Sequence, residues 1–488
     1  MKRIVRRWRV ALAFAAGTLL GVGASAAEQA QPCRVAGIRH EVLCGEVQRA
    51  LDPARPDGVK IAVHYVVVPA LARRKLPDPV FLIAGGPGQS AISLAGNVMP
   101  LFSRLNNRRD IVFVDQRGTG RSAPLVCDDK RRQPLADQFD PERQLARLRE
   151  CREQLQKLPH GDLRFFTTPI ATQDLDAVRR QLAAERINLV GASYGTRAEL
   201  DYLRQFPQSV RRMVLDGVAP PDMVLPASFS TDGQAAFDAM LQACEGDAGC
   251  ARAYPQMRTE WAAWLKRLPQ TVTVQHPLSG ESESVALTRD MVLGAVRGPL
   301  YSPLLAQALP EAIHEAANGR VQALLTLGSG LSSRKNMAPA MGMHFSVMCA
   351  EDVPRLAQST DAPGADFGSE AARLYQRVCA DWPRGELPPA FYTLPKSPAP
   401  VLLLSGGIDP ATPPRHGARV AQALGPLARH VVVPQAGHGV MSLGCMPEVM
   451  QRFIDAIDDA AALAVDARCA QSIPRPPVFR PVAPGSVP

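Results

Sequence analysis

The stretch from Ile187 to Thr196 constrains the fold of this chain more than any other. Three of its first four residues are apolar, which predicts a short buried strand over Ile187–Val190, and Thr196–Phe206 alternates apolar and polar residues at helical spacing. Between them lies a Gly-x-Ser-x-Gly sequence centred on Ser193. A sharp strand-to-helix turn needs glycine on both sides, because the helix packs so closely on the strand that a Cβ would clash. We therefore expect the Ser193 hydroxyl to stand clear of the backbone as a nucleophile.

The length and charge of the chain narrow the possibilities further. With 488 residues it is longer than one core usually supports, so we expect a large domain that carries an inserted one. The formal net charge is +9, but five of these positive charges lie within the first nine residues, which leaves +4 for the rest. No basic run with interleaved aromatic residues follows. Nucleic acid is therefore not an expected partner.

The N-terminus has the pattern of a secretory signal peptide, residues 1–26. A basic start is followed by the apolar stretch Val10–Val22 and then by small residues, which predicts cleavage after Ala26 or Ala27. A transmembrane anchor is the alternative, but the apolar run is short. No later segment approaches the roughly 20 apolar residues that a spanning helix needs. We expect export to the periplasm or the extracellular space, with no membrane span after cleavage.

The ten cysteines agree with export, because disulfides persist in oxidising compartments. They fall into neighbouring couples along the chain, which favours sequential pairing among the many possible connectivities. The expected bridges are Cys33–Cys44, Cys127–Cys151, Cys244–Cys250, Cys349–Cys379 and Cys445–Cys469. No spacing of Cys and His residues indicates a zinc site, so neither a metal nor a cofactor is expected.

Buried-strand patterns occur in two blocks that a long helical block separates. The expected strands are Val59–Val68, Pro79–Ile83, Asp110–Val114, Ile187–Val190, Val210–Leu215, Val401–Leu404 and His430–Val433. From Ser228 to Tyr392 the patterns are mainly helical. We therefore expect an α/β core in two parts, 27–222 and 395–470, with a helical cap, 223–394, inserted between them, and a proline-rich tail, 471–488.

Local patterns inside these blocks give further expectations. Thr172 has the position of a helix cap for Gln173–Ala184, and Ser302-Pro303 opens a helix over Leu304–Ala317. The segment 124–160 is charged and its pattern is irregular. Two short alternating runs around Pro277–Gly280 predict a β-hairpin.

Two further chemical groups follow predicted strands in the second part of the core. Asp409 lies in the loop after Val401–Leu404, and His438, between two glycines, follows His430–Val433. The chain order Ser, Asp, His is that of the α/β-hydrolases. A serine hydroxyl is a poor nucleophile, so an imidazole must take its proton, while a carboxylate orients the imidazole. Asp216, which also follows a strand, is the alternative acid.

Five motifs in order strengthen this interpretation. They are Ala-Gly-Gly-Pro-Gly at 84–88, Asp-Gln-Arg-Gly-Thr-Gly-Arg-Ser at 115–122, Gly-Ala-Ser-Tyr-Gly-Thr at 191–196, Gly-Ile-Asp at 407–409 and Gly-His-Gly at 437–439. Together they resemble the proline iminopeptidase and tripeptidyl aminopeptidase family of secreted α/β-hydrolase serine exopeptidases. The resemblance covers about 59–220 and 400–457, and more faintly the cap. One departure is Ala84, where proline iminopeptidases usually carry His, and this weakens a strict preference for proline.

The resemblance implies roles for further residues. The oxyanion hole would consist of the amide of Tyr194 and an amide from Gly85 or Gly86. In such exopeptidases the cap binds the free amino terminus of the peptide, commonly with acidic side chains, and Glu351 with Asp352 is the acidic candidate. The alternative is a solvated acidic pair that caps a helix.

The expected function is removal of one to three residues from the free amino terminus of peptides. A carboxylesterase that acts on small esters with the same triad is the alternative, and a catalytically dead binding protein is a third possibility. The complete set of Ser193, Asp409 and His438 argues against the third.

Overall fold

The computed structural model describes residues 30–128, 133–329 and 338–479. The predicted signal peptide and the last nine residues of the predicted tail lie outside them. Nine strands form one sheet in the order β1-β2-β3-β5-β4-β6-β7-β10-β11. Their bounds are β1 (Gln31–Cys33), β2 (Val42–Ala50), β3 (Lys60–Val68), β4 (Val80–Ile83), β5 (Ile111–Val114), β6 (Ile187–Ala192), β7 (Val210–Asp216), β10 (Val401–Gly406) and β11 (Ala428–Val433).

The sheet is parallel from β5 through β4, β6, β7 and β10 to β11, and antiparallel from β1 through β2 and β3 to β5. All seven predicted strands are confirmed. Strands β1 and β2 were not predicted, because β2 alternates only partly buried side chains and is rich in polar residues. The carboxyl ends of the parallel strands lie on one edge, where parallel sheets place functional groups.

Helices cover both faces of the sheet, because successive side chains of a strand point to opposite faces. Phe81 and Ile83 of β4 belong to one apolar cluster, whereas Val80 and Leu82 belong to the other. The first face is covered by α4 (Thr168–Gln181), α5 (Tyr194–Gln205) and α15 (Pro414–Leu424); the second is covered by α1 (Ala91–Val98), α16 (Met446–Asp455) and α17 (Asp459–Leu463).

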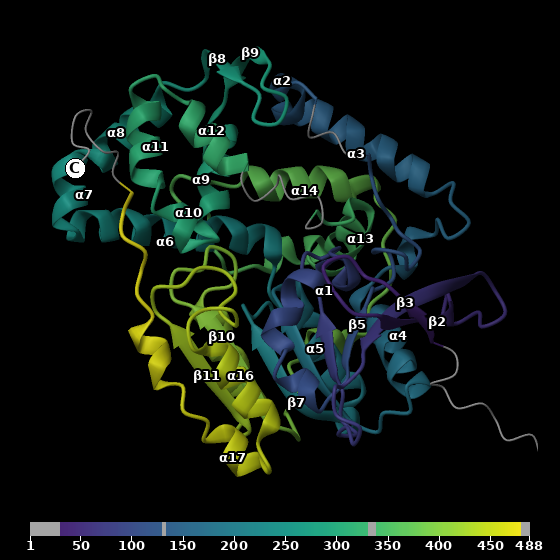
Figure 1. The fold of residues 1–488 in the computed structure, drawn as a ribbon. Helices are drawn as coiled ribbons and strands as arrows, with labels where there is room; N and C mark the ends of the chain where they lie inside the picture. Colours follow the sequence, from purple (N-terminus) through teal and green to yellow (C-terminus); the bar gives the residue numbers. More distant parts are fainter. Residues whose placement is uncertain (1–29, 129–132, 330–337, 480–488) are drawn as a thin grey trace, which may run out of the picture.

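Between β7 and β10 the chain leaves the sheet and forms a helical layer with an apolar cluster of its own, seen in the upper part of Figure 1. We call residues 223–394 the cap segment. Its elements are α6 (Leu225–Gly246), α7 (Ala248–Ala253), α8 (Met257–Lys266), β8 (Gln270–Gln275), β9 (Ser282–Leu287), α9 (Arg289–Leu300), α10 (Pro303–Ala306), α11 (Leu309–Ala317), α12 (Gln322–Ser329), α13 (Met341–Glu351) and α14 (Glu370–Asp381). Strands β8 and β9 form the predicted hairpin.

Three local predictions were wrong. The segment expected to be irregular contains α2 (Leu135–Phe139) and α3 (Pro141–Leu155), which lie beside the cap segment in Figure 1. The Asp140 side chain caps α3, and the Arg- and Glu-rich sequence hid its narrow apolar stripe. Helix α4 begins at Thr168, so Thr172 lies inside it and bonds the Thr168 carbonyl oxygen.

The third error concerns the helix predicted over Leu304–Ala317, which is divided into α10 and α11. Pro310 is the second residue of α11. Proline has no N–H to donate, and its ring clashes with the carbonyl four residues earlier, so a continuous helix cannot pass through this position.

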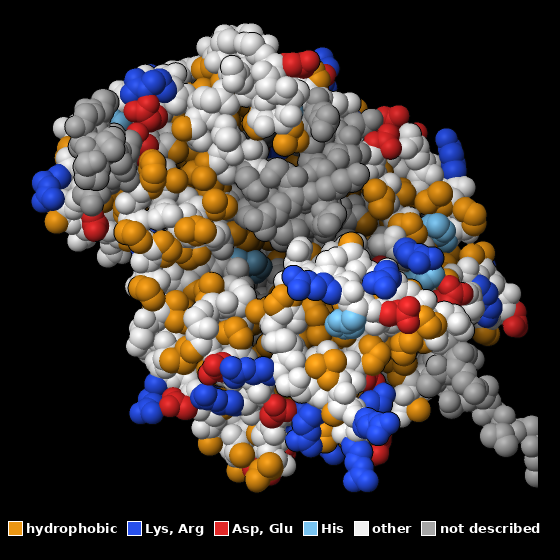
Figure 2. Space-filling model, in the orientation of Figure 1, with side chains coloured by type: hydrophobic (Ala, Val, Ile, Leu, Met, Phe, Trp, Pro, Cys, Tyr) orange, Lys and Arg blue, Asp and Glu red, His pale blue; other side chains and the backbone are white. Residues whose placement is uncertain are grey.

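The five predicted disulfides are all present, and the described residues contain no free cysteine. Within the same residues, no helix has the length and apolar character that crossing a membrane requires. On the face drawn in Figure 2, Lys and Arg side chains are interspersed with Asp and Glu side chains over the core below the cap segment.

The bridges predict a graded effect on stability. Cys445–Cys469 closes a loop with a sequence separation of 24, and Cys244–Cys250 one with a separation of 6. In the chain-entropy account, removal of the first by double Cys→Ala substitution lowers the free energy of unfolding by about 3 kcal/mol, and removal of the second by about 2 kcal/mol. Denaturant unfolding of both variants measures the difference. Equal losses, or a free thiol in the unmodified chain by mass mapping, would contradict the account.

Candidate active site

Ser193 occupies a strained turn between β6 and α5. Its φ of 57° and ψ of −127° lie in a region that residues with a side chain rarely adopt. The turn is held by two sets of hydrogen bonds: the Ser193 N–H donates to the Asp216 carbonyl oxygen at 2.8 Å, and both the N–H and the hydroxyl of Thr196 donate to the Ser193 carbonyl oxygen. The strain therefore persists because neighbouring elements fix the backbone on both sides.

The glycines of this motif are required by close approach, as the sequence predicts. A Cβ at Gly195 would lie 2.5 Å from the Ile83 carbonyl oxygen of β4, and one at Gly191 would lie 2.9 Å from the Glu199 carboxyl carbon. The Ile83 oxygen belongs to the backbone of the sheet, and the Glu199 side chain is buried, so a Cβ at either glycine would force a neighbour to shift. Helix α5 can therefore start directly against the sheet, with Tyr194 as its first residue.

His438 and Asp409 form a hydrogen-bonded pair at the same edge of the sheet. The His438 Nδ1 donates to Asp409 Oδ2 at 2.8 Å, which leaves Nε2 as the proton acceptor. The other Asp409 oxygen accepts from the N–H groups of Ala411 and Thr412, and the Thr412 hydroxyl donates to Oδ2 at 2.9 Å. The buried carboxylate is thus fully hydrogen-bonded and fixed in direction.

Charge and burial act in opposite directions on this pair. Burial lowers the pKa of His438, but the Asp409 charge and hydrogen bond outweigh it and raise that pKa above its ordinary value. Burial likewise raises the pKa of Asp409, but the neighbouring His438 and the two loop amides outweigh it and lower that pKa. The imidazolium form of His438 is therefore stabilised, as a proton-accepting residue in acyl transfer requires.

Asp216, the alternative acid, has a different position. Both of its carboxylate oxygens accept from the Val440 N–H at 2.9 Å, and Oδ2 also accepts from the Met441 N–H. Burial raises the pKa of Asp216 to about 6, although these amide bonds oppose the shift. Asp409 and not Asp216 is hydrogen-bonded to the His438 ring, while Asp216 holds the backbone that follows His438.

The end of β7 also brings Ser193 and His438 to one place. The Asp216 carbonyl oxygen holds the Ser193 N–H, and the next residue, Gly217, lies against the His438 ring. A Cβ at Gly217 would be 3.2 Å from His438 Cε1. Ser193 and His438 are therefore neighbours across Asp216 and Gly217.

The glycine-rich loop after β4 lies against the serine. A Cβ at Gly85 would be 3.1 Å from Ser193 Cβ, and Gly86 has a positive φ of 113°. Gly88 is covered by the cap segment, because its carbonyl oxygen accepts from the Ala340 N–H at 2.8 Å. The amides of Tyr194 and of Gly85 or Gly86 remain the predicted oxyanion donors.

Two aromatic residues of the cap segment contact the loop that holds His438 and the glycine-rich loop after β4, and no sequence pattern indicated either residue. The Tyr301 carbonyl oxygen accepts from the His438 N–H at 2.9 Å, and the Tyr301 ring packs edge-on against the imidazole with centroids 5.1 Å apart. His344 Nδ1 donates to the Pro87 carbonyl oxygen at 3.3 Å, and His344 Nε2 accepts from the Tyr375 hydroxyl. Burial lowers the pKa of His344 to about 4, so this ring is neutral.

The predicted acidic pair lies at the end of α13, and its surroundings are not those of a solvated pair. The side chains of Glu351, Asp352 and Arg197 are all 0% exposed. Arg197 donates to Asp352 at 2.8 and 3.1 Å and to Glu351 at 3.3 Å. Glu351 also accepts from the Thr168 N–H and hydroxyl, and the Thr168 hydroxyl is 2.7 Å from the Tyr194 hydroxyl. The solvent-exposed alternative is therefore wrong.

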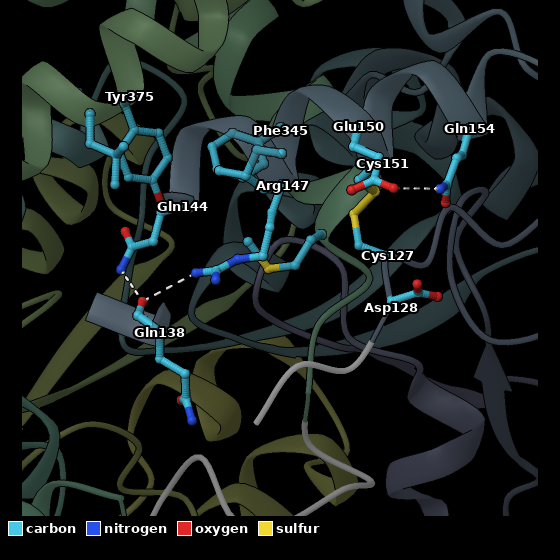
Figure 3. A pocket seen from close by; sticks show the side chains of 13 residues that line it. Cys127, Asp128, Gln138, Gln144, Arg147, Glu150, Cys151, Gln154, Phe345 and Tyr375 are labelled. Carbon is cyan, nitrogen blue, oxygen red and sulfur yellow. Dashed lines mark hydrogen bonds between the residues drawn. A yellow bond between two sulfur atoms is a disulfide. The ribbon is translucent and has the colours of Figure 1, made fainter. Parts of the chain in front are cut away.

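A pocket of about 410 Å³ lies between α3 and the cap helices α13 and α14 (Figure 3). Its polar lining includes Gln144, Arg147 and Glu150 of α3. Tyr375 lines the pocket and also bonds His344, which in turn contacts the loop after β4. The described residues contain no cluster of His, Cys, Asp and Glu that could hold a metal ion.

A strained serine on the turn before α5, a histidine with a buried carboxylate partner and a glycine-rich loop define the class of protein: this is a serine hydrolase. The model of the alpha/beta hydrolase fold family matches residues 78–444, and the chain belongs to that family. The fold predicted from the sequence is thereby confirmed.

Three relatives with assigned names are similar to this chain over most of its length. The chain is 28% identical over 432 residues to serine protease Hip1 of Mycobacterium tuberculosis, covering 80% of this chain and 82% of that protein. It is 27% identical over 479 residues to tripeptidyl aminopeptidase of Streptomyces coelicolor, covering 89% and 84%. It is also 28% identical over 417 residues to carboxylesterase B of Mycobacterium tuberculosis, covering 78% of each chain. These relatives confirm the predicted family resemblance.

Isosteric substitutions distinguish the two candidate acids of the triad, Asp409 and Asp216. Asp409→Asn removes the charge that orients and stabilises His438, and we expect kcat to fall about 10⁴-fold. Asp216→Asn keeps an acceptor for the Val440 amide and leaves the His438 partner intact, so we expect a loss of no more than about tenfold, with lower thermal stability. Initial rates on an activated ester measure both. A larger loss in Asp216→Asn than in Asp409→Asn would reverse the assignment.

The same analysis predicts the acid limb of the pH profile. Neutral His438 is the reactive form, and its raised pKa keeps it protonated to a higher pH than an ordinary histidine. The kcat/KM of the unmodified chain should therefore fall with decreasing pH, with a midpoint above about 6.5.

Proposed function

We propose that this chain is an exported serine exopeptidase that removes one to three residues from the free amino terminus of peptides. The observation that carries the proposal is the Asp409–His438 pair beside a strained Ser193, under a cap segment that contacts both catalytic loops. Two of the relatives are named as a serine protease and as a tripeptidyl aminopeptidase, and both match over more than four fifths of their length. Five disulfides support export.

The proposed reaction assigns one role to each of these residues. His438 Nε2 takes the Ser193 proton as the hydroxyl oxygen attacks the scissile carbonyl carbon, and Asp409 stabilises the resulting imidazolium. The oxyanion accepts from the Tyr194 amide and from Gly85 or Gly86. His438 then gives its proton to the leaving amine as the C–N bond breaks. Water hydrolyses the acyl-enzyme by the same steps in reverse order.

Glu351, with Asp352, is the proposed partner of the substrate's ammonium group. Arg197 compensates only one of the two carboxylate charges, so an added cation would complete the balance. Burial raises the pKa of Glu351 to about 7, although the Arg197 charge opposes the shift, and a bound ammonium would favour its ionised form. Because both carboxylates are sealed from solvent, such binding requires the 3.3 Å contact between Arg197 and Glu351 to open.

A carboxylesterase that uses the same triad is the second candidate. One relative is named as a carboxylesterase. The burial of Glu351 and Asp352 also favours this candidate, because an ester substrate needs no partner for an ammonium group.

The two candidates are distinguished by blocking the amino terminus. We expect a chromogenic tripeptide amide with a free amine to be cleaved with a kcat/KM about ten- to a hundredfold above that of its N-acetyl form, which corresponds to one charge-assisted contact. Aminoacyl and dipeptidyl amides extend the series to shorter peptides. A short-chain ester serves as the reference for an intact triad. Cleavage of the ester with no cleavage of any free-amine peptide would favour the carboxylesterase.

The Glu351→Gln variant tests the ammonium site separately. We expect a large loss on the free-amine peptide and little change on the N-acetyl peptide and the ester. An equal loss on all three would assign Glu351 to support of the Thr168–Tyr194 contact beneath the serine turn.

A further inference from the structure

Arg297 of α9 carries a guanidinium whose Nε and Nη2 atoms receive no hydrogen-bond acceptor from the described residues. Its guanidinium stacks on the rings of Phe229 and Tyr301, with its central carbon 4.6 and 5.3 Å from the ring centroids. Its Nε and Nη2 atoms are buried and have no hydrogen-bond partner, and Arg297 forms no ion pair within residues 30–128, 133–329 and 338–479. A buried donor that lacks an acceptor is destabilising, and a charged one more so.

The position of Arg297 relates this unpaired charge to the catalytic residues. The Tyr301 ring on which it stacks packs in turn against the His438 imidazole, and the Tyr301 carbonyl oxygen holds the His438 N–H. The second ring that Arg297 contacts, that of Phe229, packs edge-on against the Tyr375 ring. The Tyr375 hydroxyl donates to His344 Nε2, and His344 Nδ1 donates to the carbonyl oxygen of Pro87 in the loop after β4. Arg297 therefore lies between the residues that contact His438 and those that contact the glycine-rich loop after β4.

The electrostatic effects agree with this placement. Burial and the Asp409 charge dominate the pKa of His438, and the Arg297 charge lowers it. Arg297 also opposes the burial that raises the pKa of Tyr375. The Arg297 charge therefore acts on the pKa of His438 and on that of Tyr375 in the cap segment.

We propose that Arg297 is a subsite for a carboxylate of the substrate. A planar guanidinium held by two aromatic rings is pre-organised, and a carboxylate offers it the acceptors that the protein does not. In a peptide, as the proposed function has it, the carboxylate is either an acidic side chain next to the scissile bond or the C-terminal carboxylate of a short peptide. In an ester substrate it is an acid group on the acyl chain.

Arg355 serves as a matched control, because it also stacks on an aromatic ring but already has a hydrogen-bond acceptor. Its guanidinium lies 4.3 Å from the centroid of the Tyr392 ring, and its Nη1 donates to the Asp222 carbonyl oxygen. Replacement of Arg355 with Gln therefore removes an aromatic-stacked cap arginine that already has an acceptor. We expect it to leave the preference for acidic over neutral substrates unchanged.

The test uses matched substrates that differ only in one charge. The first pair is the 4-nitrophenyl ester of glutaric acid and that of glutaramic acid, with spontaneous hydrolysis subtracted. The second is a chromogenic peptide with Asp or Asn beside the scissile bond, and the third a tripeptide with a free or amidated C-terminus. Each is assayed with the unmodified chain and with the Arg297→Gln, Arg297→Lys and Arg355→Gln variants.

We expect the unmodified chain to prefer the acidic member of the ester pair, and of one peptide pair, by about ten- to a hundredfold in kcat/KM. The peptide pair that responds identifies the source of the carboxylate. Arg297→Gln should remove the preference by slowing only the acidic substrate, and Arg297→Lys should keep part of it. Labelling of each variant by a fluorophosphonate shows that its triad is intact.

Two outcomes would overturn the proposal: no preference in the unmodified chain for any pair, or an equal loss on acidic and neutral substrates in Arg297→Gln. The experiment also distinguishes failure of the Arg297 subsite from failure of the proposed exopeptidase function. A preference for the acidic ester without cleavage of any peptide would retain the subsite and reject the exopeptidase. Cleavage of free-amine peptides without any charge preference would do the reverse.

Discussion

The site depends on one residue, Asp216, at the end of β7. Its carbonyl oxygen holds the N–H of Ser193, and its carboxylate holds the N–H groups of Val440 and Met441 just after His438. The serine turn and the histidine loop are more than two hundred residues apart in sequence, yet both are tied to the same strand end. Strand β7 is hydrogen-bonded between β6 and β10, so this anchor is as rigid as the sheet. A strained serine and a largely buried histidine can then keep fixed relative positions.

The cap segment contributes to the site by backbone contact. The Tyr301 carbonyl oxygen accepts a hydrogen bond from the His438 N–H, and the Ala340 N–H donates to the carbonyl oxygen of Gly88 in the glycine-rich loop. Gly437 has no side chain because a Cβ there would lie 2.5 Å from the Tyr301 carbonyl oxygen. Any displacement of α9 or of the start of α13 would therefore reach the histidine or the glycine-rich loop. The cap segment therefore helps to position both His438 and the glycine-rich loop.

The sequence predicted what depends on local patterns. The parallel strands, the serine turn and the disulfide pairs follow from short apolar runs, paired glycines and cysteine spacing, and the structure has all of them. The sequence could not predict that Arg197 pairs with Glu351 and Asp352 or that Arg297 stacks on Phe229, because these contacts join helices that are distant in sequence. Helix α3 was missed because its charged surface outweighed its few apolar residues. The break in the helix predicted at 304–317 was missed because Pro310 overrode the periodicity of the segment. The acidic pair shows the limit most clearly: Glu351 and Asp352 have the sequence of a solvated cap, but Arg197 from α5 buries them.

The central claim is that Ser193, activated by His438, is the nucleophile. Its most direct test is treatment of the folded chain with a fluorophosphonate, followed by intact mass measurement and peptide mapping. The account predicts one adduct per chain, located on Ser193, with none formed in Ser193→Ala and slow labelling in Asp409→Asn. An adduct on another residue, or undiminished labelling of Ser193→Ala, would contradict it.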